Sequence, residues 1–220
     1  FAVYDIRKKK LYLARDIAGE KPLYYIYKDK KLFFASEAKA LVKTLNLVKQ
    51  KSETYEAFQH CLNETLFKNL LQLPAAHYLE YDLNLNKIIK ITEYWTLKRR
   101  RINLKTCEEE LNYLLKKSVK LRTFCDVDYA LYYSKGVDSS LISTFHEFKS
   151  KMYFNDQYDW KSNFFKNIKK IVYHLDFPVG SYSSYPLWKL AERAKKKKIK
   201  VILSGEGAGE IFGGYIRYMP

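Results

Sequence analysis

The sequence predicts an α/β protein made of two parts, and three observations support this prediction. The first hundred residues hold short strand patterns separated by charged turns. The later residues alternate apolar strand patterns with helical ones, which is typical of parallel β-α units. Five of the eight glycines lie between Gly205 and Gly214, directly after one of the predicted strands. Parallel sheets bind ligands at the carboxyl ends of their strands, so we expect a functional site there.

Composition excludes a disordered chain and gives little reason to expect a nucleic-acid partner. The 220 residues are 47% hydrophobic and 16% aromatic, and the formal net charge is +16. Such a chain is long enough for one or two domains with a real core. Only 8 of the 40 basic residues are Arg, which leaves 32 Lys. A nucleic-acid reader would use more of the forked Arg side chain, so the charge indicates an A/T-rich genome instead.

The cysteines and the apolar runs bear on location. Cys61, Cys107 and Cys125 show no Cys-x-x-Cys spacing, which argues against a zinc site and predicts a cytoplasmic, reducing environment. No apolar run approaches the ~18 residues that span a bilayer, so no membrane partner is expected. The chain begins at Phe1 inside a strand pattern and ends at Pro220 after the glycine cluster. We therefore expect it to be a piece of a longer protein.

In the first part, strand patterns occupy most of the length. The predicted strands are residues 1–4, 11–14, 23–27, 32–35, 77–82 and 87–94, the last two forming a hairpin. A helix is expected over 36–41, with Ser36 as its N-cap. The basic run from Lys98 to Arg101 is interpreted as a solvated connector, which divides a domain over 1–100 from one over 101–220.

In the second part, helices and strands alternate. A helix is predicted from Thr106, whose hydroxyl could cap it, and its apolar stripe extends to Leu121. A buried strand is expected over 127–133, a helix over 139–148, a helix over 187–198 and a strand over 200–204.

The first segment that could carry chemistry is the turn around Ser134-Lys135-Gly136-Val137-Asp138-Ser139-Ser140. A strand-to-helix turn directs backbone N–H groups at one spot, where the helix dipole favours an anion. Asp138 would repel a bare phosphate, but it fits a site in which Mg²⁺ lies between carboxylate and phosphate. An ordinary capped helix start explains the same spacing.

The second segment is Ser204-Gly205-Glu206-Gly207-Ala208-Gly209-Glu210, which also follows a strand. Its alternating glycines allow another group to approach the backbone closely. If the turn is helical, Glu206 and Glu210 share a face and could serve a metal ion or a proton transfer. A flexible loop is the alternative reading.

Together the two segments resemble one family. The first is similar to the pyrophosphate-binding Ser-Gly-Gly-x-Asp-Ser loop of ATP pyrophosphatases. The second resembles the Gly-Glu-Gly-Ala-Asp-Glu-(Leu/Ile)-Phe-Gly-Gly-Tyr segment of glutamine-hydrolysing asparagine synthetases. Further similarities, in order, are Arg15-Asp16 with Gly19 to Tyr25, Ala35 to Leu41, Leu73 to Leu79, Tyr94-Trp95 and Tyr173 to Pro178. The resemblance covers nearly the whole chain.

The resemblance implies a fold, an activity and a set of site residues. The fold would be the C-terminal part of an αββα N-terminal-nucleophile amidotransferase domain, followed by the start of a parallel-sheet ATP pyrophosphatase domain. The activity would be activation of aspartate by ATP and Mg²⁺ and transfer of ammonia from glutamine, a small-molecule reaction of an enzyme that could be a homodimer. Ser134, Lys135, Gly136, Val137, Asp138, Ser139, Ser140, Ser204 and Gly205 would bind ATP or pyrophosphate, Asp138 would bind Mg²⁺, and Glu206 and Glu210 would be catalytic.

The sequence departs from the family pattern in one longer stretch and at two site positions. Residues 148–172 are too few for the strand and helix that normally build the adenine pocket of that family. Lys135 replaces the first loop glycine and lacks its backbone freedom, and Gly209 replaces an Asp that shares the metal site. Three alternatives follow. A β-lactam synthetase-like ligase shares both segments, a catalytically degenerate relic explains the departures, and a basic nucleic-acid-binding protein explains the charge.

Overall fold

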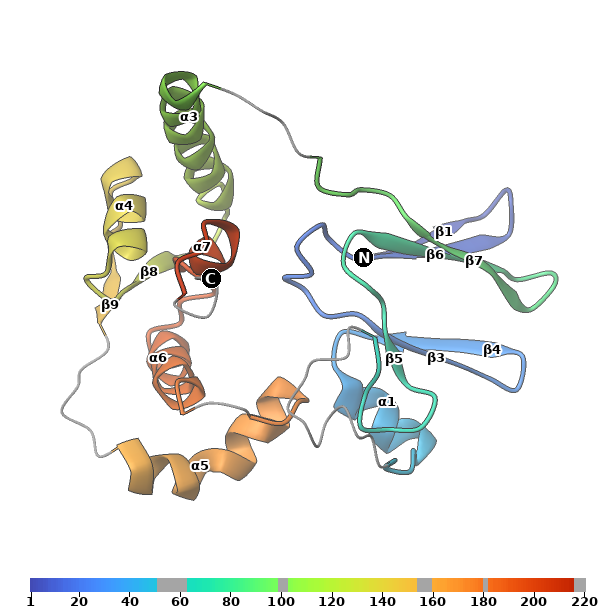
Figure 1. The fold of residues 1–220 in the computed structure, drawn as a ribbon. Coiled ribbons are helices and arrows are strands. Elements are labelled where there is room, and N and C mark those ends of the chain that lie inside the picture. Colours follow the sequence, from blue (N-terminus) through green and yellow to red (C-terminus); the bar gives the residue numbers. More distant parts are fainter. Residues whose placement is uncertain (51–62, 99–102, 154–159, 180–181, 216–220) are drawn as a thin grey trace. The chain divides into compact units, whose positions relative to one another are not determined.

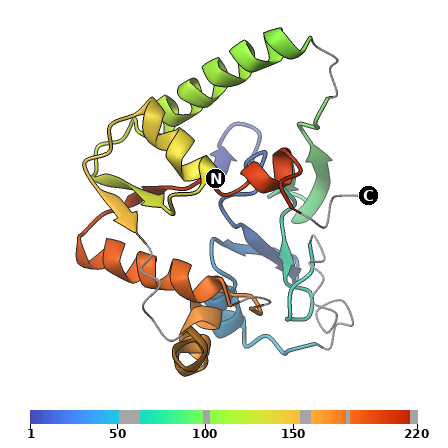
Figure 2. The same ribbon diagram turned by 60° about the vertical axis from the view of Figure 1, so that its left-hand side comes forward.

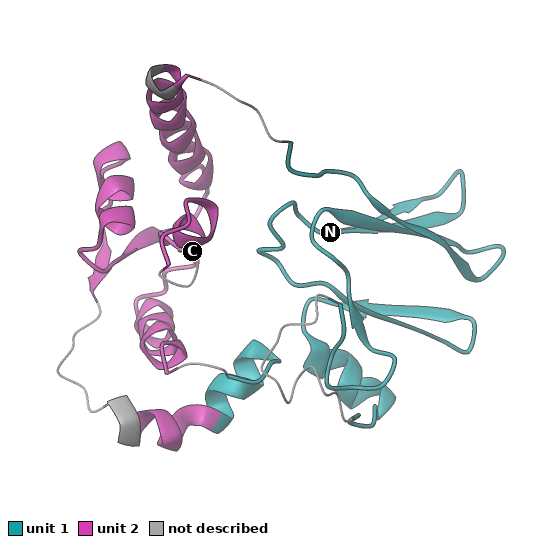
Figure 3. Ribbon diagram, in the orientation of Figure 1, with its two compact units in different colours: residues 1–99, 169–180 teal, residues 100–168, 181–220 magenta. Residues whose placement is uncertain are grey.

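A computed structural model describes residues 1–50, 63–98, 103–153, 160–179 and 182–215. Its residues divide into two compact units. Unit 1 comprises residues 1–99 and 169–180, and unit 2 comprises 100–168 and 181–220 (Figure 3). The predicted α/β class is confirmed, because unit 1 holds antiparallel sheets and unit 2 a parallel one.

Unit 1 stacks two antiparallel sheets (Figure 1). The four-stranded sheet has the order β1-β2-β6-β7, and the three-stranded sheet has the order β4-β3-β5. Its strands are β1 (Ala2–Asp5), β2 (Lys10–Ala14), β3 (Tyr24–Lys28), β4 (Lys31–Ala35), β5 (Leu71–Gln72), β6 (His77–Asp82) and β7 (Lys87–Glu93). Helix α1 (Ala38–Leu45) follows β4.

Side-chain alternation along β3 explains the layers of unit 1. Tyr25 faces the first sheet and packs with Leu13, Leu79 and Tyr81. Its neighbours Tyr24 and Ile26 face the opposite way and pack with Ala38 and Leu41 of α1. Because successive strand residues point to opposite faces, one strand contributes to two cores. The order of layers is therefore sheet, sheet, helix.

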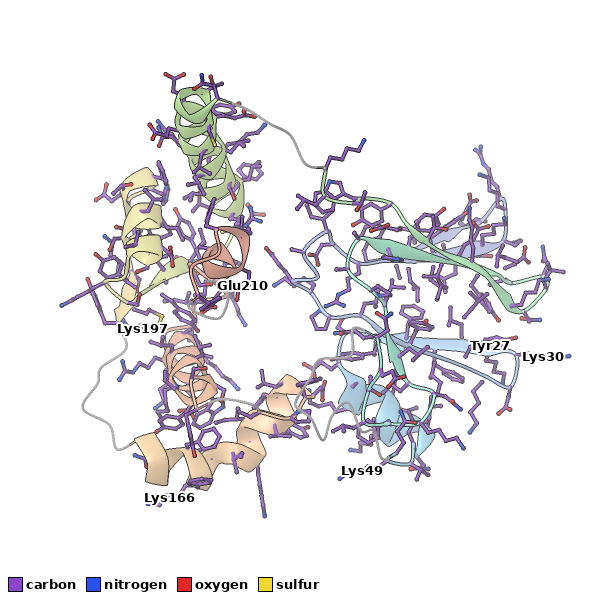
Figure 4. The ribbon with its side chains drawn as sticks, viewed as in Figure 1. Tyr27, Lys30, Lys49, Lys166, Lys197 and Glu210 are labelled. Carbon is purple, nitrogen blue, oxygen red and sulfur yellow. The ribbon has the colours of Figure 1, made fainter. Side chains whose placement is uncertain are left out.

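Two tyrosines join the hairpin tips of the sheets. Tyr27 donates a hydrogen bond to the carbonyl of Asn86 at 2.6 Å, and Tyr81 donates one to the carbonyl of Lys30 at 3.0 Å. The two rings meet edge to face with centroids 6.3 Å apart. Figure 4 labels Tyr27 and Lys30 on the β3–β4 hairpin. These contacts hold the two sheets together at one end.

The Arg15-Asp16 motif fixes the loop between β2 and β3. The Arg15 guanidinium donates to the carbonyls of Lys21, Leu73 and Gly19 at 3.2, 2.8 and 2.8 Å. Burial lowers the pKa of this guanidinium. Gly19 has φ +68°, and a Cβ there would lie 2.9 Å from Nη2 of Arg15. This part of the family-like pattern therefore has a structural role.

Asp16 completes the same loop through its backbone contacts. Its carboxylate accepts the N–H groups of Ala18, Glu20 and Lys21 at 3.2, 2.9 and 3.0 Å. Burial alone would raise the pKa of Asp16, but these donors outweigh it and the pKa lies below its usual value. The charged form of Asp16 thus stabilises the loop.

Unit 2 is built on a three-stranded parallel sheet with the order β10-β8-β9. Its elements are α3 (Leu104–Arg122), β8 (Tyr129–Tyr133), α4 (Val137–Phe145), β9 (Lys151–Tyr153), α5 (Trp160–Leu175), α6 (Ser184–Lys196), β10 (Val201–Leu203) and α7 (Ala208–Ile211), with the end of α5 belonging to unit 1. Figure 2 shows α3 and α4 on one face of the sheet and α6 on the other.

The two faces of this sheet have separate cores. On one face, Leu131 and Leu203 pack with Val119 of α3. On the other, Ala130 packs with Leu190 of α6. The alternation of residues 130 and 131 is that of a strand buried on both sides, as parallel sheets require.

Several boundaries differ from those predicted. Glu37, not Ser36, occupies the N-cap position of α1, and its side chain makes no capping hydrogen bond. Thr106 lies inside α3, which begins at Leu104, so its capping role was wrong. Residues 148–172 contain a strand and a helix, β9 and most of α5, neither of which was predicted from the sequence. Arg99 to Arg101 of the expected connector lie outside the described residues.

Within the described ranges, every helix is too short or too polar to cross a membrane.

We predict that Arg15→Lys destabilises the protein. Lysine keeps the charge but cannot reach three carbonyls with one rigid fork, so we expect a loss of about 1–3 kcal/mol in the free energy of unfolding. Urea unfolding measures it. The exposed Arg7 is the matched control, and Arg7→Lys should change stability by less than about 0.5 kcal/mol. Equal stability of the two variants would contradict this role.

Candidate functional site

Parallel pairing brings the two candidate segments to one edge of the unit 2 sheet. Val201, Ile202 and Leu203 of β10 pair in parallel with Tyr129, Ala130 and Leu131 of β8. Because the strands run the same way, the segments that follow them leave from the same edge. Ser134, Lys135 and Gly136 form the turn after β8, Val137 to Ser140 begin α4, Ser204 to Gly207 follow β10, and Glu210 lies in α7.

The turn after β8 is held by its own serines. Ser139 is 4% exposed, and its hydroxyl accepts the N–H of Ser134 at 3.2 Å and donates to the carbonyl of Gly136 at 3.3 Å. The Ser134 hydroxyl lies 3.1 Å from that of Ser139 and accepts the N–H of Gly136 at 3.2 Å. Two of the predicted binding hydroxyls therefore shape the loop. The N–H groups of the first turn of α4 have no partners within the helix and are the natural anion donors.

Ser140 is placed differently. Its hydroxyl donates to that of Tyr133 at 3.3 Å, and its N–H closes the first turn on the carbonyl of Gly136 at 3.0 Å. Nothing in the spacing of the motif singled out Tyr133, which precedes it. The one signal that could have identified Tyr133 was its position at the end of a predicted strand, directly before the predicted phosphate loop.

Lys135 adopts a conformation that suits glycine. Its φ is +65°, in the left-handed region, where a side chain costs about 1–2 kcal/mol. The glycine expected at this position from the resemblance would carry no such cost. The loop thus keeps its backbone shape despite the substitution, and the exposed amine of Lys135 is available for a contact with an anion.

Gly205 brings the second segment against the first. A Cβ at this position would lie 2.7 Å from Cβ of Asp138 and 3.3 Å from the backbone nitrogen of Ser139. Real Cβ atoms do not approach other carbon atoms so closely, so only glycine fits. The two segments therefore meet at the start of α4, although Gly205 and Asp138 are 67 positions apart in the sequence, and together they make one candidate site.

The helical turn that would have put the two glutamates on one face does not include both of them. Helix α7 begins at Ala208, so Glu206 lies before it and only Glu210 belongs to it (Figure 4). Both side chains are exposed. The hydroxyl of Tyr215 donates to Oε1 of Glu210 at 3.0 Å. Sequence reasoning did not identify Tyr215 as a partner of this carboxylate.

Gly209 is packed beneath the same tyrosine. A Cβ there would lie 2.8 Å from two ring atoms of Tyr215, and the N–H of Gly214 bonds to the carbonyl of Gly209 at 2.8 Å. The tyrosine ring therefore fills the space that a larger residue at 209 would need. An aspartate at this position requires Tyr215 to move.

The acidic residues fit a metal that is shared with a ligand better than a metal held by protein alone. Across the described ranges, no three His, Cys, Asp or Glu side chains gather around one point. Mg²⁺ in phosphate sites commonly uses one or two carboxylates plus phosphate oxygens. Asp138, exposed in the first turn of α4 beside the serine loop, meets that requirement.

Both parts of the chain match known protein families. Residues 1–95 match a glutamine amidotransferase domain family, and residues 156–220 match an asparagine synthase family. Putative asparagine synthetase [glutamine-hydrolyzing] 2 of Methanocaldococcus jannaschii is 30% identical over the whole chain, which covers 50% of that relative. Asparagine synthetase [glutamine-hydrolyzing] 1 of Bacillus subtilis is 27% identical over 99% of the chain and 39% of the relative. Asparagine synthetase B of Escherichia coli is 25% identical over 99% and 43%.

The chain spans half or less of the length of these curated relatives. The alignment with the archaeal relative has 257 positions for 220 residues, so the relative has at least 37 positions that this chain lacks.

We predict that Lys135→Gly stabilises unit 2. Glycine relieves the left-handed strain at φ +65°, and we expect a gain of up to about 1 kcal/mol in the free energy of unfolding, measured in urea. The control is Lys149→Gly, because Lys149 is also exposed but has no positive φ. There the greater freedom of the unfolded chain should cost up to about 1 kcal/mol. A loss of stability in Lys135→Gly equal to that of the control would refute the strain.

Proposed function

We propose that the chain contributes to an ATP-dependent carbon–nitrogen ligase of the glutamine-hydrolysing asparagine synthetase type, which its two family matches and its similarity to curated synthetases support. The reaction is the activation of aspartate as an acyl-adenylate and its amidation to asparagine with ammonia taken from glutamine. The substrates are small molecules, and the location is the cytoplasm. The domain division falls near residue 100, with the amidotransferase part before it and the synthetase part after it.

The observation that carries this proposal is the contact of Gly205 with Asp138 and Ser139. An anion site at a helix N-terminus is common, but here a second segment with two exposed carboxylates is joined to it. A site for pyrophosphate thus lies next to groups suited to handle a nucleophile. This combination supports adenylation followed by amide formation.

We assign the residues as follows, each role being part of the proposal. The pyrophosphate group is bound by Ser134, Lys135, Gly136, Val137, Asp138, Ser139, Ser140, Ser204 and Gly205. The first turn of α4 supplies N–H donors and a favourable dipole. The Lys135 ammonium adds a positive charge.

Asp138 is the proposed Mg²⁺ ligand. A bound Mg²⁺ neutralises charge on the transferred and leaving phosphate groups. Asp138 suits this role because a carboxylate beside a phosphate is tolerated only when a cation separates them. Gly209 offers no second carboxylate, so the protein would hold the ion through fewer of its own ligands.

Glu206 is proposed to orient the incoming ammonia and to hold its proton. It is exposed directly after β10, and its N–H lies 3.4 Å from the Ser204 hydroxyl. Glu210, held by Tyr215, has a supporting role in the same reaction.

Two alternatives stay open because of particular residues. A catalytically degenerate family member is favoured by Gly209, whose missing carboxylate is replaced by the ring of Tyr215. A β-lactam synthetase-like ligase would use the same loops on a different carboxylate.

The test is aspartate-dependent exchange of labelled pyrophosphate into ATP by the full-length protein. We expect exchange in the unsubstituted protein and its loss in Asp138→Asn. Glu206→Gln should keep the exchange and lower amide formation by about 100-fold or more, because it removes a proton-handling group and no pyrophosphate contact.

The other possible results of the exchange test distinguish the alternatives. A folded protein without exchange refutes the ligase and favours the relic. Exchange that depends on another carboxylic acid but not on aspartate favours the β-lactam synthetase-like alternative. Full exchange of pyrophosphate in Asp138→Asn would show that Asp138 is not part of the binding site.

A further inference from the structure

Two of the family-like motifs that the proposed chemistry does not use meet in unit 1. Lys39 belongs to the segment Ala35 to Leu41, and Asp176 to the segment Tyr173 to Pro178. Nζ of Lys39 lies 3.0 Å from Oδ2 of Asp176, and the backbone N–H of Lys39 bonds to Oδ1 at 3.3 Å. The Asp176 side chain is only 9% exposed and that of Lys39 19%. The pair is therefore largely removed from water.

Asp176 acts as a cap for a helix that has none of its own. The N-cap residue of α1, Glu37, makes no capping hydrogen bond with its side chain. The first turn of a helix has unpaired N–H groups and a partial positive charge. A carboxylate from 137 residues away supplies both the acceptor and the negative charge that α1 lacks.

The other surroundings strengthen the same contact. Glu37 lies 2.7 Å from Nζ of Lys39, and that ammonium lies 5.2 Å from the centre of the Tyr173 ring. Burial by itself lowers the pKa of Lys39, but hydrogen bonds with Glu37 and Asp176 outweigh it, so the pKa is raised. Burial together with the charge of Asp176 raises the pKa of Tyr24. The lysine thus stays charged at the centre of the cluster.

Asp176 is poorly suited to its own helix. It follows directly after α5, where a negative charge opposes the helix dipole. Its φ is +56°, a left-handed conformation that glycine adopts at lower cost. Such strain persists where other contacts require it. The contact with Lys39 supplies that requirement.

Helix α5 connects the two units. Its residues up to 168 belong to unit 2, while those from 169 onward, with Asp176, belong to unit 1 (Figure 3). Within unit 1, the Lys39–Asp176 contact therefore holds the end of a helix that begins in unit 2 against the first turn of α1.

We propose that Lys39 and Asp176 are positioning residues that couple the two half-reactions. By fixing the end of α5 to α1, they keep glutamine hydrolysis productive, so that the ammonia released is used for amide formation and is not lost. This proposal rests on the proposed function. Neither residue contacts the reacting atoms in it.

The test measures coupling in the full-length protein as the ratio of glutamate formed to asparagine formed. In Lys39→Met we expect this ratio to rise by about 5-fold or more, because the contact that couples the sites is lost. Synthesis with added ammonium should stay near that of the unsubstituted protein, which also shows that the variant is folded. Lys39→Arg should restore most of the coupling.

The controls separate this role from general stability. Lys43 lies exposed on the same helix, and Lys43→Met should leave the ratio unchanged. Asp176→Asn should uncouple as Lys39→Met does, and the double variant should be no worse than either single variant, because both remove one interaction.

The outcomes distinguish the two proposals. An unchanged ratio in Lys39→Met, or equal loss of ammonium-dependent and glutamine-dependent synthesis, overturns the coupling role alone. An unsubstituted protein that exchanges no pyrophosphate overturns the ligase and the coupling together.

Discussion

The candidate site depends on one constraint, the parallel pairing of β8 with β10. It places two segments, separated by a helix-strand-helix-helix connection, at the same edge of one sheet. The contact is then completed by the absence of a side chain at Gly205, where a Cβ would lie 2.7 Å from that of Asp138. The serines hold the first loop in shape, and α4 directs its unpaired N–H groups to the same place. The chemistry proposed for the site follows from this meeting of backbones more than from any single side chain.

The sequence predicted those elements whose apolar residues follow a clear period. Strands β2, β6 and β7 appear within about a residue of the expected bounds because one face is buried and the pattern alternates. The strand and helix between 148 and 172 were not predicted, since the strand has only three residues and the helix mixes aromatic and lysine residues. The predicted N-terminal ends of two helices were also wrong. Ser36 and Thr106 have the right chemistry for caps, but α1 uses a carboxylate from a distant segment, and α3 begins earlier.

In the candidate site, too, features that depend on neighbouring residues were predictable and features that depend on distant contacts were not. The spacing of the two motifs indicated which residues face the sheet edge, and the backbone of Lys135 keeps the glycine-like conformation. The spacing could not indicate that Glu206 lies outside α7 or that the ring of Tyr215 covers Gly209. These depend on where a short helix begins and on a side chain six residues away. The contact of Lys39 with Asp176 was beyond reach for a stronger reason, because one sequence holds no record of which ion pairs form across 137 residues.

The most direct measurement of the central claim, that two distant segments form one anion site, uses the glycines as probes. The chain has only eight, so selective labelling with ¹⁵N-glycine gives few backbone signals to follow by NMR. During titration with magnesium pyrophosphate, the signals of Gly136 and Gly205 should shift together with one dissociation constant, while that of Gly19 in unit 1 stays fixed. Signals of Gly136 and Gly205 that do not move, or that follow different dissociation constants, would contradict a single site.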